Sequence, residues 1–276
     1  MVAINLSISR AWDETRGIFG RDGGLITSVA LAMIVLPEVI AGIIAPQTPG
    51  AGSPSGAVQI LRLAAVLISF VGQLSIVRLA LGPSTTVGSA IGHGARRFPS
   101  ALGAVLLLML GLALFLIPVM FILGAVFGVN VLKMSGQHTN GAAGLLVLAV
   151  TLIVLAISVR FTLVTPVASA EPIGPIKIIR RSWDLTAGNF WRLLGFIVLL
   201  LIATLALLFA AGIVGGLLAR MVSPQIEPFS LGALIVALVG GLAQGAFSIL
   251  TAVMLARIYA QAAGRDAQVS VPSSGT

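Results

Sequence analysis

The sequence predicts an all-α integral membrane protein with six transmembrane helices, and three observations support this. The chain is 58% hydrophobic and only 9% charged, whereas soluble domains average about 25% charged residues. Six apolar segments are each long enough to cross a bilayer. A phrase of twelve residues occurs twice, each time just before such a segment, which is typical of a protein built from internal repeats.

The apolar segments cover about residues 25–45, 58–81, 101–127, 142–164, 193–218 and 231–259. A helix of about 20 residues crosses the hydrocarbon core, so each segment can form one span. We expect a single six-span domain over residues 1–264, followed by a disordered tail rich in Ser, Pro and Gly at 265–276. The first twenty residues lack the apolar run of a secretory signal peptide, so the first span is expected to stay in the membrane.

The basic residues indicate which way the spans run. Thirteen of the sixteen lie on one side of the predicted membrane, and only Arg62, Lys133 and Arg220 lie on the other. Because Lys and Arg concentrate in cytoplasmic loops, we expect both termini in the cytoplasm of a bacterial cell, with the spans in its inner membrane. The same pattern accounts for the net charge of +8, so nucleic acid is not expected as a partner.

The repeated phrase predicts the internal architecture. Residues 10–21 and 181–192 are identical at seven of twelve positions, and a weaker middle copy at 88–100 keeps Arg96, Arg97 and Phe98. The second, fourth and sixth spans also end alike, in Val77-Arg78-Leu79, Val159-Arg160-Phe161 and Ala256-Arg257-Ile258. A two-span unit preserves orientation, so we expect three parallel repeats, about residues 1–82, 83–170 and 171–264, around an axis along the membrane normal.

Each unit is expected to begin with an amphipathic helix that lies in the headgroup layer. In the third copy, Ile176, Ile179 and Trp183 share one helical stripe, while Lys177 and Arg181 lie on another. The three tryptophans of the chain all fall in these segments, at a depth that indole prefers. The repeated elbow motif consists of Trp12, Asp13, Gly17, Trp183, Asp184, Gly188 and Trp191.

Three polar side chains fall inside the predicted spans. Glu38 directly follows Pro37 in the first span, where a carboxylate costs a few kcal/mol unless it is paired, solvated or protonated. It is either functional or a structural partner, for example of Arg62. Gln73 and Gln244 are either hydrogen-bonding contacts between helices or ligands. We treat the three as one candidate intramembrane site, and a shared cavity would favour transport over packing.

The cytoplasmic ends of the spans carry a second candidate site. Arg78, Arg160 and Arg257 close the even-numbered spans, and with Arg181 they form a basic belt that either holds anionic lipid headgroups or only fixes the topology. The pairs Arg10/Asp13 and Arg181/Asp184 have the i, i+3 spacing that lets side chains meet on one helical face.

Residues suited to catalysis or metal binding are scarce. The chain has no cysteine, and its two histidines, His93 and His138, fall on opposite sides of the predicted membrane. Neither a nucleophile motif nor a phosphate-binding loop occurs, and neither histidine has a carboxylate beside it that suits a metal. We therefore expect no enzyme activity, no cofactor and no metal.

Residues 159–192 resemble a known bacterial family. The resemblance rests on Val159-Arg160-Phe161, Pro166, Glu171-Pro172 and the run from Ile179 to Arg192 that contains Ser182-Trp183-Asp184-Leu185-Thr186 and Trp191. These residues resemble the glycerophosphoryl diester phosphodiesterase membrane domain and the related multi-pass inner-membrane proteins of the YciC type. The resemblance implies a six-span inner-membrane protein without phosphodiesterase activity, because no soluble phosphodiesterase domain is present.

These observations favour a non-enzymatic accessory or scaffold protein that associates with membrane lipid. Its expected partners are membrane lipids, anionic phospholipids among them, and a membrane-protein partner. The alternative is a transporter or channel for a small solute or lipid, which would use Glu38, Gln73 and Gln244.

Overall fold

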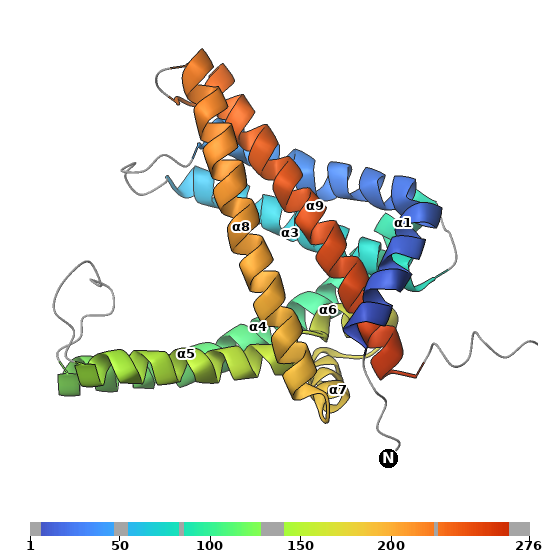
Figure 1. Ribbon diagram of the computed structural model, residues 1–276, viewed down its shortest axis with the longest axis vertical. Helices are drawn as coiled ribbons and strands as arrows, with labels where there is room; N and C mark the ends of the chain where they lie inside the picture. The colour runs from blue at the N-terminus through green and yellow to red at the C-terminus, as the bar shows by residue number, and fades with distance from the viewer. Residues whose placement is uncertain (1–6, 47–54, 83–85, 128–140, 224–225, 265–276) are drawn as a thin grey trace, which may run out of the picture.

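A computed structural model describes residues 7–46, 55–82, 86–127, 141–223 and 226–264, and every regular element among them is helical (Figure 1). Six helical segments are long and apolar enough to cross a membrane, which confirms the predicted multi-pass membrane class. The elements are α1 (Ile8–Ala30), the π-helical η1 (Leu31–Val35), α2 (Leu36–Ile44), α3 (Gly56–Leu81), α4 (Val87–Phe127), α5 (Gly141–Phe161), α6 (Val164–Ala170), α7 (Pro175–Thr186), α8 (Phe190–Val222) and α9 (Leu231–Ala262).

Serine side chains fix where three of these helices begin. The hydroxyl oxygen of Ser7 accepts a hydrogen bond from the Arg10 N–H at 3.3 Å, and that of Ser230 accepts one from the Ala233 N–H at 3.1 Å. Ser55 does the same for α3. Each serine satisfies an N–H group that has no partner within the first helical turn, a contribution of about 1 kcal/mol.

The structure corrects the predicted form of the elbow helices. A separate helix precedes the span only in the third copy, as α7, whereas the first two copies continue into α1 and α4 without a break. The difference lies just after the shared glycine. In the third copy, Gly188 has a φ of +86° and the next residue, Asn189, is the N-cap of α8. In the first copy, Gly17 stays helical and is followed by Ile18, which is also helical.

The first membrane-crossing helix contains an irregular turn. Between α1 and α2, η1 forms one turn of π-helix, and Pro37 follows it at the start of α2. Proline has no backbone N–H to donate to the preceding turn, and a π-helical turn is one way in which a helix accommodates this missing hydrogen bond. The irregular turn of the first span therefore lies directly before Pro37.

Small residues bring α2, α3 and α9 close together. A Cβ at Gly245 of α9 would lie 2.5 Å from Val35 Cγ2, and one at Gly241 would lie 2.9 Å from Val39 Cγ2. A Cβ at Gly72 of α3 would lie 2.8 Å from Met33 Cβ. Glycine at these positions lets the backbones approach more closely than any other residue would.

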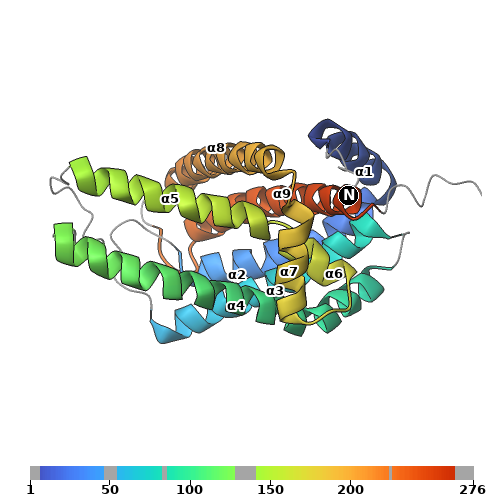
Figure 2. The same ribbon diagram turned by 90° about the horizontal axis from the view of Figure 1, so that it is seen from below.

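The helical hairpins diverge from a common base, which we define as the end that holds α6, α7, the start of α1 and the start of α4 (Figure 1). Figure 2 shows α4 and α5 running side by side away from this base. The most apolar windows of the spans formed by α4 and α8 contain no buried residue, as expected for surfaces that face lipid.

Most of the buried core lies at the base. Leu74, Val159, Phe196 and Tyr259, from α3, α5, α8 and α9, belong to one cluster and are each no more than 1% exposed. The base is therefore the part of the molecule that holds the hairpins together.

Candidate functional site

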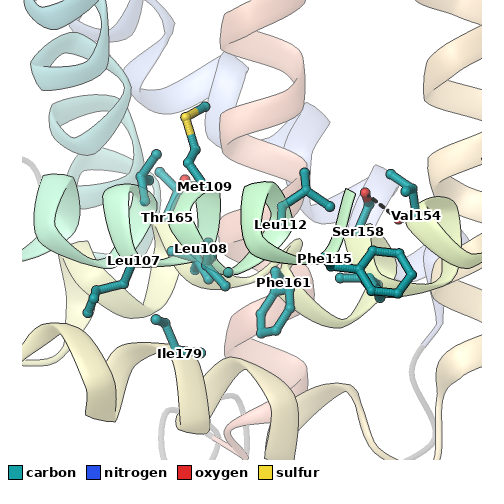
Figure 3. Close-up of a pocket in the computed structure, with 14 residues that line it drawn as sticks. Leu107, Leu108, Met109, Leu112, Phe115, Val154, Ser158, Phe161, Thr165 and Ile179 are labelled. Atoms are coloured by element: carbon teal, nitrogen blue, oxygen red, sulfur yellow. Dashed lines mark hydrogen bonds between the residues drawn. The ribbon is translucent and has the colours of Figure 1, made fainter. Parts of the chain in front are cut away.

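An apolar groove lies between α4 and α5, and we call it the α4–α5 groove (Figure 3). It has a volume of about 520 Å³, within the range typical of ligand pockets. Its lining consists of Val105, Leu107, Leu108, Met109, Gly111, Leu112, Phe115, Val154, Ile157, Ser158, Phe161, Val164, Thr165 and Ile179.

The groove offers almost no polar contact. Only Ser158 and Thr165 in its lining have polar side chains, and the Ser158 hydroxyl donates to the Val154 carbonyl at 2.8 Å (Figure 3). At the base, Ile179 of α7 and Phe161 of α5 contribute to its wall. This lining suits a hydrocarbon chain rather than a polar solute.

A second, smaller cavity lies between α3, α6 and α9, and we call it the polar pocket. It has a volume of about 120 Å³. Its lining consists of Gln73, Val77, Thr165, Pro166, Gln244, Phe247, Ser248, Thr251, Ala252 and Leu255. Two of the predicted intramembrane polar residues, Gln73 and Gln244, thus face one cavity.

Two hydroxyl groups of the polar pocket have no hydrogen-bond partner. Ser248 Oγ and Thr251 Oγ1 are both buried and unsatisfied. Most serine and threonine hydroxyls elsewhere in the spans donate to a carbonyl four residues earlier, as Ser75 does to Val71 at 2.8 Å and Thr204 to Leu200 at 2.7 Å. A buried hydroxyl without a partner costs free energy, so this pair calls for an explanation.

Glu38, the third predicted member of this site, does not line the polar pocket. It lies on α2 with its side chain exposed, and no ion pair joins it to Arg62 in the described part of the chain. Arg62 Nη2 instead donates to the Ala45 carbonyl at 2.9 Å. Of the possible structural partners of Glu38, Arg62 is therefore not the one found, because its guanidinium satisfies the carbonyl at the end of α2.

The arginines of the predicted basic belt mostly contact other protein groups. Arg257 Nε lies 2.7 Å from Glu14 Oε2, and Arg181 Nε lies 3.3 Å from Glu171 Oε1. The Arg160 guanidinium lies over the Trp183 ring at 5.0 Å, and its Nη1 is buried without a partner. Arg78 is half-buried at the end of α3. A lipid headgroup would compete with carboxylates for two of these four side chains.

The pairing expected within the elbow motif is also wrong. Arg10 Nε bonds Glu14 Oε1 at 2.8 Å, and Arg181 bonds Glu171, so neither arginine pairs with Asp13 or Asp184. Both aspartates are exposed. The i, i+4 Arg10–Glu14 contact uses the longer carboxylate side chain, and Glu171 reaches Arg181 from the loop before α7.

The residues of the elbow motif differ in their burial. Thr15 and Thr186 are buried, and Thr186 Oγ1 donates to the Trp183 carbonyl at 2.9 Å. Trp12 and Trp183 are 38% and 47% exposed, and Trp191 is 79% exposed. A Cβ at Gly17 would meet no atom within 4 Å, so this glycine is not required for packing within the chain.

One polar cluster at the base escaped sequence analysis. Tyr259 Oη donates to Glu171 Oε1 at 2.7 Å, and Arg181 contacts the same oxygen. Tyr259 is completely buried and is the single tyrosine of the chain. A lone tyrosine at the basic end of the last span was the available signal.

The described residues contain no group of three or more His, Cys, Asp or Glu side chains that could hold a metal ion. His93 Nε2 lies 2.8 Å from the Ser169 carbonyl, which ties α4 to α6. His138 lies outside the described residues, as does the tail at 265–276.

Comparison with known proteins gives one match. A family model described as a domain of unknown function, DUF7847, matches residues 6–262. No curated protein and no solved structure matches the chain. The resemblance to the glycerophosphoryl diester phosphodiesterase membrane domain and to YciC-like proteins stays a prediction.

Proposed function

Because the chain belongs to the DUF7847 family, whose function is unknown, we propose a function from the chain's own geometry. It is a non-enzymatic protein of the bacterial inner membrane that binds membrane phospholipid and acts as a lipid-associated accessory or scaffold protein. The α4–α5 groove holds one acyl chain, and this groove is the observation that carries the proposal.

The dimensions of the groove suit an acyl chain. Its lining on α4 runs from Val105 to Phe115, which corresponds to about 15 Å at 1.5 Å per residue. The hydrocarbon core of a bilayer is about 30 Å thick, so the groove has the depth of one leaflet. An empty apolar groove would forfeit dispersion contacts along its walls, and acyl chains are the apolar molecules that surround a transmembrane helix.

The base of the groove supplies a place for the headgroup. Ile179 of α7 contributes to the groove wall, while Lys177 and Arg180 on the same helix are exposed. In the proposed topology, with both termini in the cytoplasm, these side chains lie at the depth of the inner-leaflet phosphates. Exposed basic residues there attract anionic phospholipids by about 1 kcal/mol each.

Three contacts support the proposed threefold repeat of a two-span unit with an amphipathic elbow. Each elbow packs on the end of the even-numbered span that precedes it, and the first packs on the last. The Ser182 hydroxyl of α7 donates to the Arg160 carbonyl of α5 at 2.9 Å, and Glu14 of α1 pairs with Arg257 of α9 at 2.7 Å. A Cβ at Gly94 of α4 would clash with the Val71 carbonyl of α3, at 2.7 Å.

Native mass spectrometry of the full-length protein, gently extracted from its own membrane, tests the proposal. The wild-type chain should retain about one phospholipid, and Gly111→Phe should lose it. A Cβ at Gly111 meets no atom within 4 Å, so the ring fills the groove without a clash. Gly212→Phe is the matched control, because Gly212 is exposed on α8 and equally unobstructed. Equal lipid retention in both variants would refute the proposal.

A further inference from the structure

We propose that α2, α3, α6 and α9 form an intramembrane binding site for a small monovalent cation. Gln73, Gln244, Ser248 and Thr251 line the polar pocket and carry the oxygen atoms that would bind the ion. In this proposal Glu38, which lies outside the pocket lining, supplies the negative charge at the outer end of the site. This site shares only Thr165 with the lining of the α4–α5 groove, and its polar lining suits a ligand of different chemistry from the lipid.

The unsatisfied hydroxyls are the first reason. Ser248 is 6% exposed, and its Oγ and Thr251 Oγ1 lack any partner although both residues line the pocket. A donor–acceptor group buried in this way is stabilised when a ligand completes its contacts. Hydroxyl and amide oxygens are hard ligands, which bind alkali cations rather than anions or apolar groups.

The charge of the lining also favours a cation. The pocket has no Lys, Arg or His in its wall, and its polar members are neutral amides and hydroxyls. Oxygen dipoles of this kind can replace the hydration shell of a monovalent ion inside a membrane protein. A volume of about 120 Å³ leaves room for one ion together with a few water molecules.

The position of Glu38 follows from the packing of α2. Ile34, four residues earlier, packs at Gly72 of α3, and Val35, three residues earlier, packs at Gly245 of α9. Glu38 directly precedes Val39, which packs at Gly241 of α9, so Glu38 lies close to the crossing of α2 with α9. Its side chain is exposed, and we place its carboxylate at the outer opening of the polar pocket.

The same packing gives the depth of the carboxylate. Val35 lies at the level of Gly245, the residue after Gln244, and Ile34 lies at the level of Gly72, the residue before Gln73. Glu38 is one helical turn further along α2, which corresponds to about 5.4 Å outward from the two glutamines. A charged carboxylate at that depth costs free energy, and a bound cation would neutralise it and offset this cost.

The backbone near the site is irregular on two sides. The π-helical turn η1 lies directly before the turn that carries Glu38, and a break at Thr162 and Leu163 separates α5 from α6, which carries Thr165. Ion sites of membrane transporters are commonly built at such interruptions, where internal repeats meet. In the proposed repeat, α3, α6 and α9 belong to three different units.

Direct ion binding tests the site in the full-length protein reconstituted in lipid nanodiscs. Radioactive sodium and rubidium ions, the latter as a potassium surrogate, are measured by a scintillation proximity assay against a choline background. We expect saturable binding of at least one of them, at about one ion per chain. The double variant Ser248→Ala, Thr251→Val and the variant Glu38→Gln should each weaken binding at least about tenfold.

The control variant is Thr204→Val on α8. The Thr204 hydroxyl donates to the Leu200 carbonyl and lies outside the polar pocket, so the ion affinity of this variant should equal that of the wild type. Gln244→Leu is a second pocket variant, for use if the double variant does not accumulate. The side chain of Gln244 is exposed, so we expect the fold to tolerate this change. No saturable binding of either ion, or binding that survives both Glu38→Gln and Gln244→Leu, would overturn the proposal. Gly111→Phe should leave ion affinity intact, so the lipid and cation sites fail independently.

Discussion

The two sides of this molecule solve helix packing in opposite ways. On one side, η1, α2, α3 and α9 approach so closely that a single added Cβ at Gly245 of α9 would lie 2.5 Å from Val35 Cγ2 of η1. On the other side, α4 and α5 run from the same base and leave a groove of about 520 Å³ between them. A Cβ added at Gly111 in that groove would meet no atom within 4 Å.

The contrast teaches that apolar sequence alone does not determine helix contact in a bilayer. Lipid tails are as apolar as leucine, so spans associate through close van der Waals contact and polar groups rather than through a hydrophobic driving force. The α2–α3–α9 side has small residues at its crossings, whereas the groove is lined by large residues such as Leu108, Leu112 and Phe115.

The largest of the three effects is expected at the close contact between η1 and α9. Gly245→Leu should destabilise the fold by about 2–3 kcal/mol, because Val35 cannot move away from the new side chain without displacing α2. Gly240→Leu on the same helix has no atom within 4 Å of its Cβ and should change stability by less than about 0.5 kcal/mol. Unfolding in mixed micelles by titration with denaturing detergent measures both; equal losses would mean that α2 and α9 are not held together at this crossing.

A smaller loss is expected at the base, which joins the two sides. Tyr259→Phe removes the hydroxyl that donates to Glu171 Oε1 and should destabilise the fold by about 1–2 kcal/mol. Arg181 still contacts the carboxylate, which limits the effect. The same detergent titration measures the loss. A variant as stable as the wild type would show that the base does not depend on this hydrogen bond.

The smallest effect is expected on the lipid-facing surface of α4. Leu114 is 66% exposed, and Leu114→Ala should change stability by less than about 0.5 kcal/mol, because the side chain contacts lipid in both the folded and the dissociated helices. Thermal unfolding in nanodiscs provides the measurement. A loss above about 1 kcal/mol would mean that another protein surface covers α4.

Sequence analysis predicted the helical class and the six spans because long apolar runs have one physical solution in a bilayer. The sequence does not reveal which glycine faces which helix, so the close contacts at Gly72, Gly241 and Gly245 follow only from the structure. The sequence also does not show that Gln73 and Gln244 line one pocket, because this depends on how α3 and α9 pack.

The groove and the ion pairs could not be predicted from the sequence, because they depend on contacts between residues far apart in the chain. Whether α4 and α5 touch depends on how each packs at the base, through contacts such as His93 with Ser169 and Pro175 against Gly103. These contacts join residues about seventy to eighty positions apart. Arg181 likewise pairs with Glu171, ten residues earlier, instead of Asp184, and Arg257 pairs with Glu14 at the other end of the chain. Of the arginines that pair with these two glutamates, only Arg10 keeps a local partner, Glu14 at i+4.

The most direct test of the central claim maps where acyl chains contact the protein. A phospholipid with a photoreactive diazirine in its acyl chain is incorporated into nanodiscs with the full-length chain, and the crosslinked residues are identified by mass spectrometry. We predict crosslinks concentrated on the groove lining of α4 and α5, reduced severalfold by Gly111→Phe and unchanged by Gly212→Phe. Crosslinks spread evenly over the exposed faces of α4, α5 and α8, and insensitive to Gly111→Phe, would contradict it.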